Sequence, residues 1–299
     1  MKQVIATVIS NAEIMSGVNL MWLGAPDIAA TAQPGQFITV RCEDFVLRRP
    51  FSIHQVSPNQ VAILFKAVGK GTLWLSRRQA GDKVDVLGPL GNGFSIPSVI
   101  ARHEVPRQSR NLLLVAGGIG MAPLRFLAQH AFSQHSITLI QGASTAAQSL
   151  ILNPSPFKGE GRGECGKQSS LSPLPSEIRL VSVTEDGSAG RKGMVTDILP
   201  DFLDWADQVY GCGPLSMYKA MAELNCHSEG AERPKNLAQD GSCGESKLKK
   251  CQISLEVRMG CGIGACYGCT INTKKGLRKV CRDGPIFELD DILWEGVRI

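Results

Sequence analysis

The feature that most constrains this chain is a group of four cysteines close to its C-terminal end. They stand within 21 residues in the order C-x4-C-x2-C-x11-C. Structural zinc sites commonly use paired C-x2-C knuckles, whereas this spacing is typical of plant-type 2Fe-2S centres. Most residues between the first three cysteines are small, which lets a loop wrap closely enough for backbone N–H groups to reach anionic sulfides. We therefore predict a 2Fe-2S cluster, with zinc and disulfides as alternatives, on Cys261, Cys266, Cys269 and Cys281.

The stretch between the third and fourth cysteines predicts a short hairpin. Residues 270–280, TINTKKGLRKV, alternate in the manner of two strands joined by a turn. A hairpin here returns the chain to the cysteine loop. The fourth ligand, Cys281, is then expected at a strand end beside that loop.

The rest of the chain falls into two segments with different periodicities. At 299 residues it exceeds what one hydrophobic core usually supports. Residues 1–105 contain short β-rich runs between turn signals, which predicts a small antiparallel barrel. Residues 106–250 alternate buried strands with helical stretches, which predicts a parallel sheet with helices on both faces. With residues 251–299, we predict a multidomain β and α/β protein: a β-barrel domain, a parallel-sheet nucleotide-binding domain and a small C-terminal cluster domain.

Two stretches do not fit this plan, residues 153–177 and 226–247. Both are rich in glycine, serine, proline and charge, and neither has a helix or strand period. Their low apolar content cannot offset the entropy lost on ordering. We predict disordered surface inserts in the second segment. A partner-docking loop, or a use for Cys165, Cys226 and Cys243, is the alternative.

Composition and charge argue against several classes of protein. Lys plus Arg is 32 and Asp plus Glu is 27, so the net charge of +5 is too small to favour nucleic-acid binding. The first residues lack a signal-peptide core, and the longest apolar run, 112–128, contains Arg125 and several glycines, unlike a membrane span. Ten cysteines are too sparse for a secreted disulfide scaffold. We expect a cytoplasmic protein that binds neither nucleic acid nor membrane.

Two features of the first segment suit phosphate groups. Residues 48–53, RRPFSI, form an extended run that can put a guanidinium and a hydroxyl on one phosphate path. In LFKAVGKGT, residues 64–72, the N–H groups around Gly69, Gly71 and Thr72 can form a nest that leads into a helix over 73–78. An arginine pair alone is more often a solvated surface feature. Two such features on one small barrel favour an anionic cofactor there.

The second segment carries a glycine-rich turn. Residues 112–124, LLLVAGGIGMAPL, place Gly117, Gly118 and Gly120 between a buried strand and a helix that begins near Pro123. Glycines at such a turn let a pyrophosphate approach the backbone and the helix N-terminus. The spacing is G-x-G-x-x-P and not G-x-G-x-x-G. It therefore predicts a nucleotide site without establishing a Rossmann fold.

A further turn, YGCGP, follows the last strand of the predicted parallel sheet. It puts Cys212 and Gly213 at the carboxyl edge, where open α/β folds bind ligands. A buried structural cysteine explains Cys212 equally well. Residues 144–147, which follow LIQGA, offer no arginine or lysine to a 2′-phosphate. This favours NAD over NADP.

The order of these motifs resembles one family. RRPFSI, GKGT, AGGIGMAPL, TEDGSAGRKGMVTDIL, GCGP and CGIGACYGC…VCRDGPIF together resemble electron-transfer subunits of NAD-dependent (class 1B) dihydroorotate dehydrogenases, within the ferredoxin-reductase-like superfamily. The resemblance covers residues 3–290 apart from the two inserts, and the cysteine loop followed by CRDGPIF is its most specific element. Small subunits of sulfide dehydrogenases and of ferredoxin:NAD(P) oxidoreductases share the architecture and remain the alternative. A non-enzymatic zinc-binding scaffold protein is a further one.

The resemblance implies roles for particular residues. It implies FAD on the first segment, with arginine at the phosphates and serine near the flavin; the matching residues are Arg49, Pro50, Phe51, Ser52, Leu64, Phe65, Lys66, Gly71 and Thr72. It implies NAD at Gly118, Gly120 and Pro123, with Cys212, Gly213 and Pro214 beside the nicotinamide. It also implies a 2Fe-2S cluster on the four cysteines. The two inserts interrupt the nucleotide-binding segment and depart from the family's pattern.

The cofactors that the resemblance implies have a fixed order. NAD exchanges hydride and the cluster exchanges single electrons, so FAD lies between them as the converter. The implied partner is an FMN-containing catalytic subunit that oxidises dihydroorotate in de novo pyrimidine biosynthesis, in a heterotetramer with two copies of each chain. This chain shows no TIM-barrel pattern and no candidate base for dihydroorotate. We assign it no catalytic residue of its own.

Overall fold

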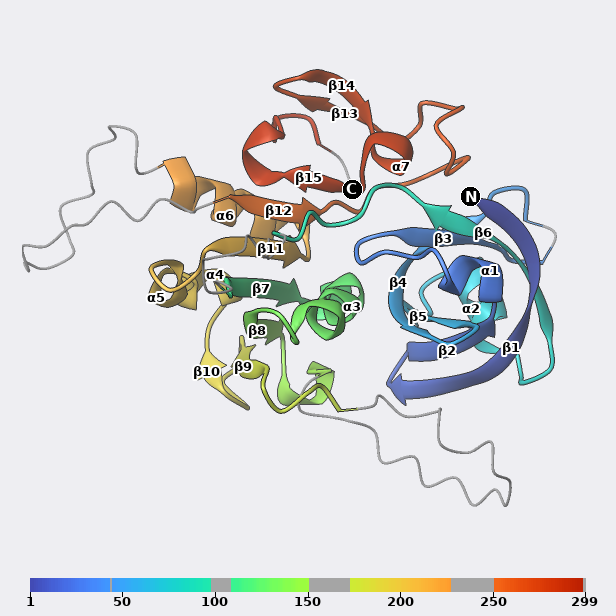
Figure 1. The fold of residues 1–299 in the computed structure, drawn as a ribbon, viewed down its shortest axis with the longest axis horizontal. Coiled ribbons are helices and arrows are strands. Elements are labelled where there is room, and N and C mark those ends of the chain that lie inside the picture. Colours follow the sequence, from blue (N-terminus) through green and yellow to red (C-terminus); the bar gives the residue numbers. More distant parts are fainter. Residues whose placement is uncertain (44, 98–108, 151–172, 227–249, 298–299) are drawn as a thin grey trace, which may run out of the picture.

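The first segment forms a closed six-stranded antiparallel barrel (Figure 1). The computed structural model describes residues 1–43, 45–97, 109–150, 173–226 and 250–297. Around the barrel the strand order is β1-β2-β5-β4-β3-β6. The strands are β1 (Lys2–Met15), β2 (Val18–Gly24), β3 (Phe37–Arg41), β4 (Arg49–Ser57), β5 (Gln60–Lys66) and β6 (Lys83–Leu90), with helices α1 (Pro26–Ala29) and α2 (Lys70–Ser76). The predicted barrel is confirmed.

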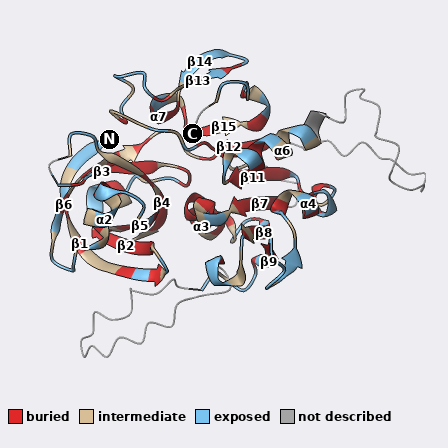
Figure 2. Ribbon diagram, turned by 180° about the vertical axis from the view of Figure 1, so that it is seen from behind, coloured by how far each residue is buried: buried red, intermediate tan, exposed pale blue. Residues whose placement is uncertain are grey.

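Strands β2 and β5 are apolar on both faces because each face is buried in a different core. Alternate side chains of a strand point to opposite faces. Met21, Ile63 and Phe65 pack inside the barrel. Leu20 and Leu64 point outward and pack against the second segment. This part of the outer barrel face is therefore an interface with the second segment, and Figure 2 colours β2 largely as buried.

The second segment forms a parallel sheet with helices on both faces, as predicted. Its strands are β7 (Asn111–Gly117), β8 (Ser136–Ala143), β9 (Arg179–Thr184), β10 (Arg191–Lys192) and β11 (Gln208–Cys212). Helix α3 (Met121–Ala131) packs on one face, and α4 (Val195–Ile198), α5 (Pro200–Leu203) and α6 (Leu215–Cys226) pack on the other. Short 3-10 turns lie at η1 (Gly118–Gly120) and η2 (Ala146–Gln148). Residues 195–203 form two short helices and not one, because Pro200 starts a new helix.

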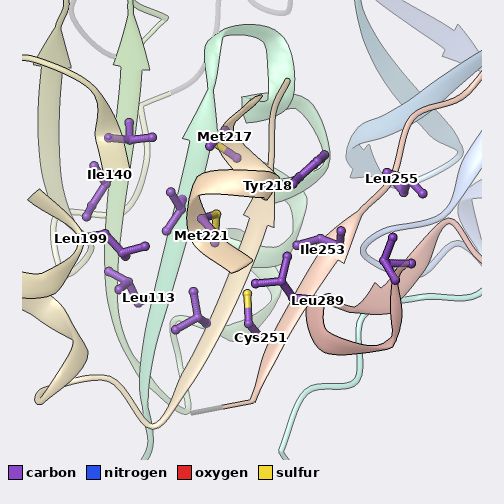
Figure 3. Packing of buried hydrophobic residues seen from close by; sticks show 14 of the residues in the cluster. Leu113, Ile140, Leu199, Met217, Tyr218, Met221, Cys251, Ile253, Leu255 and Leu289 are labelled. Atoms are coloured by element: carbon purple, nitrogen blue, oxygen red, sulfur yellow. The ribbon is translucent and has the colours of Figure 1, made fainter. Parts of the chain in front are cut away.

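The third segment shares the sheet of the second. Strand β12 (Cys251–Ser254) pairs parallel with β11, and β15 (Ile286–Glu288) pairs antiparallel with β12. The predicted hairpin is confirmed as β13 (Thr270–Thr273) and β14 (Gly276–Lys279), followed by α7 (Val280–Asp283) and η3 (Leu289–Asp291). Cys251, Ile253 and Leu289 pack with Leu113 and Met221 of the second segment (Figure 3). The boundary expected at residue 250 therefore falls at the edge of a shared core, because a sequence pattern does not show which strands pair.

The two predicted inserts lie almost wholly outside the described residues. Of 153–177, residues 173–177 are described, and of 226–247 only residue 226 is. Cys165 and Cys243 lie outside them as well. None of the helices in the described ranges has both the length and the apolar character needed to cross a membrane.

A buried polar contact joins the barrel to the nucleotide-binding segment. The ring atom Nδ1 of His54, on β4, lies 3.1 Å from the carbonyl oxygen of Ala122 at the start of α3. The next residue, Gln55, donates from Nε2 to Oε1 of Gln129, also at 3.1 Å. The His54 side chain is completely buried. Burial, and then the nearby Arg125 guanidinium, lower the pKa of His54 to about 3, although its bond to Ala122 acts in the opposite direction.

We expect this histidine to make the protein less stable in mild acid. The unfolded chain takes up a proton near pH 6.5 but the folded chain only near pH 3. Between these values the unfolded state binds more protons, so the free energy of unfolding falls as the pH drops, by at most about 5 kcal/mol. Urea titrations at pH 7, 6 and 5 measure the slope. His54→Asn should flatten it, and an identical slope in both proteins would rule out His54 as its source.

Candidate functional site

Arg49 and Gly71 meet at one end of the barrel. The antiparallel pairing of β4 with β5 places the start of β4 beside the end of β5, where Lys66 is exposed. Helix α2 follows directly and packs against that end of the barrel. A Cβ atom at Gly71 would lie 3.1 Å from Nε of Arg49, so the absence of a side chain lets the guanidinium approach the first turn of α2. Predicted residues from three elements are thus gathered at one place.

The amides before α2 cap the helix itself. The hydroxyl of Thr72 accepts hydrogen bonds from the N–H groups of Val68 at 3.0 Å and Gly69 at 3.1 Å. Of the amides in the predicted nest, that of Gly69 is therefore bonded within the protein. The amides of Lys70 and Gly71 stand in the first turn, and the helix begins at Lys70 and not at residue 73.

The side chains of Arg48, Arg49 and Ser52 in RRPFSI lie in different environments. Arg48 forms an ion pair with Asp85, with Nη2 and Oδ2 at 2.6 Å. Phe51 packs inside the barrel against Phe65, with ring centroids 5.5 Å apart. By strand alternation Ser52 lies on the outer face of β4, opposite to Arg49. Arg49 and Ser52 are three positions apart on a regular strand, so their side chains do not lie side by side.

The glycine turn after β7 packs directly on the turn after β11. Gly118 has a φ of +54°, in the left-handed region that glycine adopts readily. A Cβ at Gly120 would overlap the carbonyl group of Cys212, and one at Gly213 would lie 3.1 Å from Cα of Gly117. Pro123 is buried in the first turn of α3. The turn therefore needs its glycines for close contact between two backbones as well as for conformation.

Tyr218 fixes the position of the second turn. Its hydroxyl accepts a hydrogen bond from the N–H of Gly213 at 2.9 Å and donates to the carbonyl of Ser254 at 2.6 Å. Cys212 is completely buried, and burial raises the pKa of its thiol well above the usual range, with a smaller contribution from the charge of Glu256. Cys212 is therefore a neutral thiol at the carboxyl edge of the sheet.

Glu256 is a residue of this edge that the sequence did not indicate. The parallel pairing of Gly211 with Ile253 carries Glu256 alongside Pro214, just beyond the ends of the two strands. Its side chain is exposed, yet desolvation by the surrounding protein raises its pKa. No local motif marks it, because its neighbours come from strand pairing.

The cysteine loop directs backbone N–H groups at sulfur atoms. The N–H of Gly264 donates to Sγ of Cys281 at 3.1 Å, and the N–H of Ala265 donates to Sγ of Cys261 at 3.2 Å. The Sγ atoms of Cys269 and Cys281 lie 3.2 Å apart. All four predicted ligands are free thiols, so none is in a disulfide. Cys269 and Cys281 are buried, whereas Cys266 is exposed.

The small residues of the loop are what allow this arrangement. Gly262 and Gly264 have φ values of +73° and +84°. A Cβ at Gly260 would lie 3.1 Å from Sγ of Cys266. Partial burial opposes ionisation of Cys261, but hydrogen bonds from the loop outweigh it and lower its pKa to about 6. Burial and the neighbouring Cys269 raise the pKa of Cys281, so the fit to an iron-sulfur cluster rests on the N–H groups aimed at the sulfur atoms.

The loop does not present the geometry of a single metal ion. In the described part of the chain, no three Cys, His, Asp or Glu side chains are grouped closely enough to hold one ion. A 2Fe-2S centre divides its four thiolates between two irons.

The three predicted sites meet on strand β4 and its neighbour β3. A Cβ at Gly262 in the cysteine loop would lie 3.0 Å from Cγ2 of Thr39, which is paired with Pro50. The hydroxyl of Thr39 is buried and has no hydrogen-bond partner within the described ranges. On the other side, β4 contacts Ala122, directly after the glycine turn. The paired strands β3 and β4 therefore connect the cysteine loop with the start of α3, just after the glycine turn.

Comparison with known proteins gives consistent matches. Residues 256–293 match the iron-sulfur cluster binding domain of dihydroorotate dehydrogenase B. The chain is 34% identical over 297 residues to the electron transfer subunit of dihydroorotate dehydrogenase B (NAD(+)) from Caldanaerobacter subterraneus subsp. tengcongensis, covering 97% of this chain and 98% of the relative. The subunit of the same name from Desulforamulus reducens is 37% identical over 287 residues, covering 92% of each chain.

A solved structure supports the fold. The chain superposes on a structure of NADH-dependent reduced ferredoxin-NADP oxidoreductase with a TM-score of 0.73 and 24% sequence identity. The match covers 98% of this chain and 91% of that one. At 24% identity the match shows a shared fold and nothing more specific. The barrel, the mixed sheet and the cysteine segment thus recur together in another protein.

Proposed function

Because this chain belongs to the family of electron transfer subunits of NAD(+)-dependent dihydroorotate dehydrogenase B, we propose that it relays electrons from a catalytic partner to NAD+ through a 2Fe-2S cluster and FAD. The observation that carries the proposal is the position of the paired strands β3 and β4. Thr39 on β3 contacts the cysteine loop, and His54 on β4 contacts Ala122 just after the glycine turn. A flavin held on the outer face of these strands would convert between the hydride of NAD and the single electrons of the cluster.

Residues of the barrel suit FAD. Arg49 and the first turn of α2 provide a guanidinium and amides for phosphate groups, with Gly71 leaving room between them. Ser52 stands on the face that the sheet covers, and the buried hydroxyl of Thr39 is free to bond a group placed there. We assign Pro50, Phe51, Leu64, Phe65, Lys66 and Thr72 to the walls and supports of the same site. Bound FAD supplies the conversion between hydride and single electrons.

Residues at the carboxyl edge of the sheet suit NAD. Gly118 and Gly120 let a pyrophosphate approach the backbone, and Pro123 begins the helix behind them. Cys212 and Gly213 form the strip beside the nicotinamide, and Tyr218 holds that strip in place. Glu256 adds a carboxyl group to the same edge. These residues bind and orient the acceptor, while the packed turns exclude water from it.

The partner is the subunit that oxidises dihydroorotate in pyrimidine biosynthesis. We propose that it holds FMN and forms a heterotetramer with two copies of each chain. The exposed side of the cysteine loop supports contact with another protein, because Ile263 is 47% exposed, Tyr267 66% and Leu277 on the neighbouring hairpin 70%. Large apolar side chains grouped at a redox loop favour a docking surface over a solvated face. We assign no residue of this chain to dihydroorotate itself.

Steady-state assays of the isolated chain test this division of labour. Purified with its cofactors, the chain is expected to oxidise NADH with ferricyanide as acceptor and to leave dihydroorotate untouched. Adding the catalytic subunit should restore transfer from dihydroorotate to NAD+. Turnover of dihydroorotate by this chain alone would overturn the proposal, and so would a failure to oxidise NADH with FAD and iron present.

A further inference from the structure

Lys279 holds the cysteine loop from the strand that precedes the fourth ligand. It is the last residue of β14 and lies two residues before Cys281. Its Nζ atom donates to the carbonyl oxygen of Gly264 at 3.0 Å. The same ammonium lies 4.3 Å from the centre of the Tyr267 ring, a cation–π distance. A non-ligand cation is thus fixed against the middle of the loop by two separate contacts.

The carbonyl that Lys279 bonds belongs to a peptide group that also serves a ligand. The other end of that peptide is the N–H of Ala265, which donates to Sγ of Cys261 at 3.2 Å. A chain of bonds therefore runs from the ammonium through one peptide group to a sulfur. Each bond in such a chain polarises the next, so the ammonium strengthens the N–H···S contact.

Resting on the proposed cluster, we propose that Lys279 is a positioning residue that raises the reduction potential of the cluster through the Gly264–Ala265 peptide. Reduction adds one negative charge to the cluster. A cation nearby and stronger hydrogen bonds to the sulfurs both stabilise the reduced state more than the oxidised one. The lysine thus favours acceptance of an electron from the partner. Arg282, whose side chain packs on Gly264, adds positive charge to the same turn.

Three substitutions separate this effect from simple net charge. Lys279→Met removes the cation and its bond, Lys279→Gln removes the cation but keeps an amide donor, and Lys279→Arg keeps the cation. Lys274→Met is the matched control, because it removes the same charge from the exposed turn at the far end of the hairpin. The readout is a redox titration of the purified holoprotein followed by electron paramagnetic resonance, with iron content measured alongside.

We expect Lys279→Met and Lys279→Gln to lower the midpoint potential of the cluster. At the wild-type midpoint, the ratio of reduced to oxidised cluster should fall about tenfold, which corresponds to a shift of about 59 mV for one electron. Lys279→Arg should restore most of the shift and Lys274→Met should leave the midpoint close to wild type. An unchanged midpoint in the Met and Gln variants would overturn the proposal, as would an equal shift in Lys274→Met. Loss of iron from both Lys279→Met and Lys279→Gln would also overturn the proposal, because Lys279 would then only stabilise the fold of the loop. A wild-type protein without a cluster signal would instead refute the proposed function.

Discussion

Serine in place of Cys269 is expected to remove the iron from the purified protein while FAD stays bound. Cys269 is buried, and its sulfur lies 3.2 Å from that of Cys281. A serine hydroxyl is a poor ligand for iron, so the variant loses one of the four thiolates that the site offers. Iron content should fall at least about tenfold, since even changes outside the ligand shell cost that much. Electron transfer to or from the partner should be lost in parallel.

Cys251→Ser is the control for the loss of a buried thiol. Cys251 lies in the same segment, at the start of β12, and is buried in the shared core. Its replacement should lower stability by about 1 kcal/mol and leave iron and flavin content unchanged. Iron analysis and the flavin absorbance of both variants give the answer. A Cys269→Ser protein with its full iron and normal transfer would show that the sulfur loop does not hold the cluster.

Alanine in place of Gly120 is expected to disrupt the nucleotide turn. The added Cβ overlaps the backbone carbonyl of Cys212, which cannot rotate away as a flexible side chain could. The two turns must separate, at a cost of about 3 kcal/mol, the upper range for overpacking. NADH should then reduce the flavin at least about tenfold more slowly, as expected for a loss of well over 1 kcal/mol of binding. Stopped-flow reduction by NADH measures it, with iron and FAD content as the check on folding.

Gly118→Ala is the matched comparison in the same turn. No atom lies within 4 Å of a Cβ at Gly118, so the substitution adds only the strain of a φ of +54°, about 1 kcal/mol. The unfolding temperature of Gly120→Ala should be well below that of Gly118→Ala. Equal stability of the two variants would mean that the turns do not pack as described.

Local motifs predict the parts of this protein, whereas strand pairing decides how the parts meet. The cysteine spacing and the glycine turns were visible because their chemistry depends on residues close in sequence. The roles of Thr39, His54 and Glu256 could not be predicted from local motifs. Each of these residues has its neighbours on a different strand or helix. Lys279 lies beside Cys281 in sequence, but its bond to Gly264 depends on how the loop folds back.

Three details differ from what the motifs suggest once the strands and helices form. Strand alternation places Arg49 and Ser52 of RRPFSI on opposite faces of β4. The N–H of Gly69 bonds the Thr72 hydroxyl of its own motif. Strand β12 joins the central sheet, so the boundary expected at residue 250 lies at the edge of a shared core.

The most direct test of the account is electron paramagnetic resonance of the wild-type holoprotein after reduction with NADH alone. Strands β3 and β4 connect the start of α3, just after the glycine turn, with the cysteine loop, so electrons from NADH are expected to reach the cluster through FAD. The prediction is a rhombic signal of a reduced 2Fe-2S centre, equal in size to that obtained with dithionite. A protein that contains zinc and no iron, or a cluster that dithionite reduces and NADH does not, would contradict it.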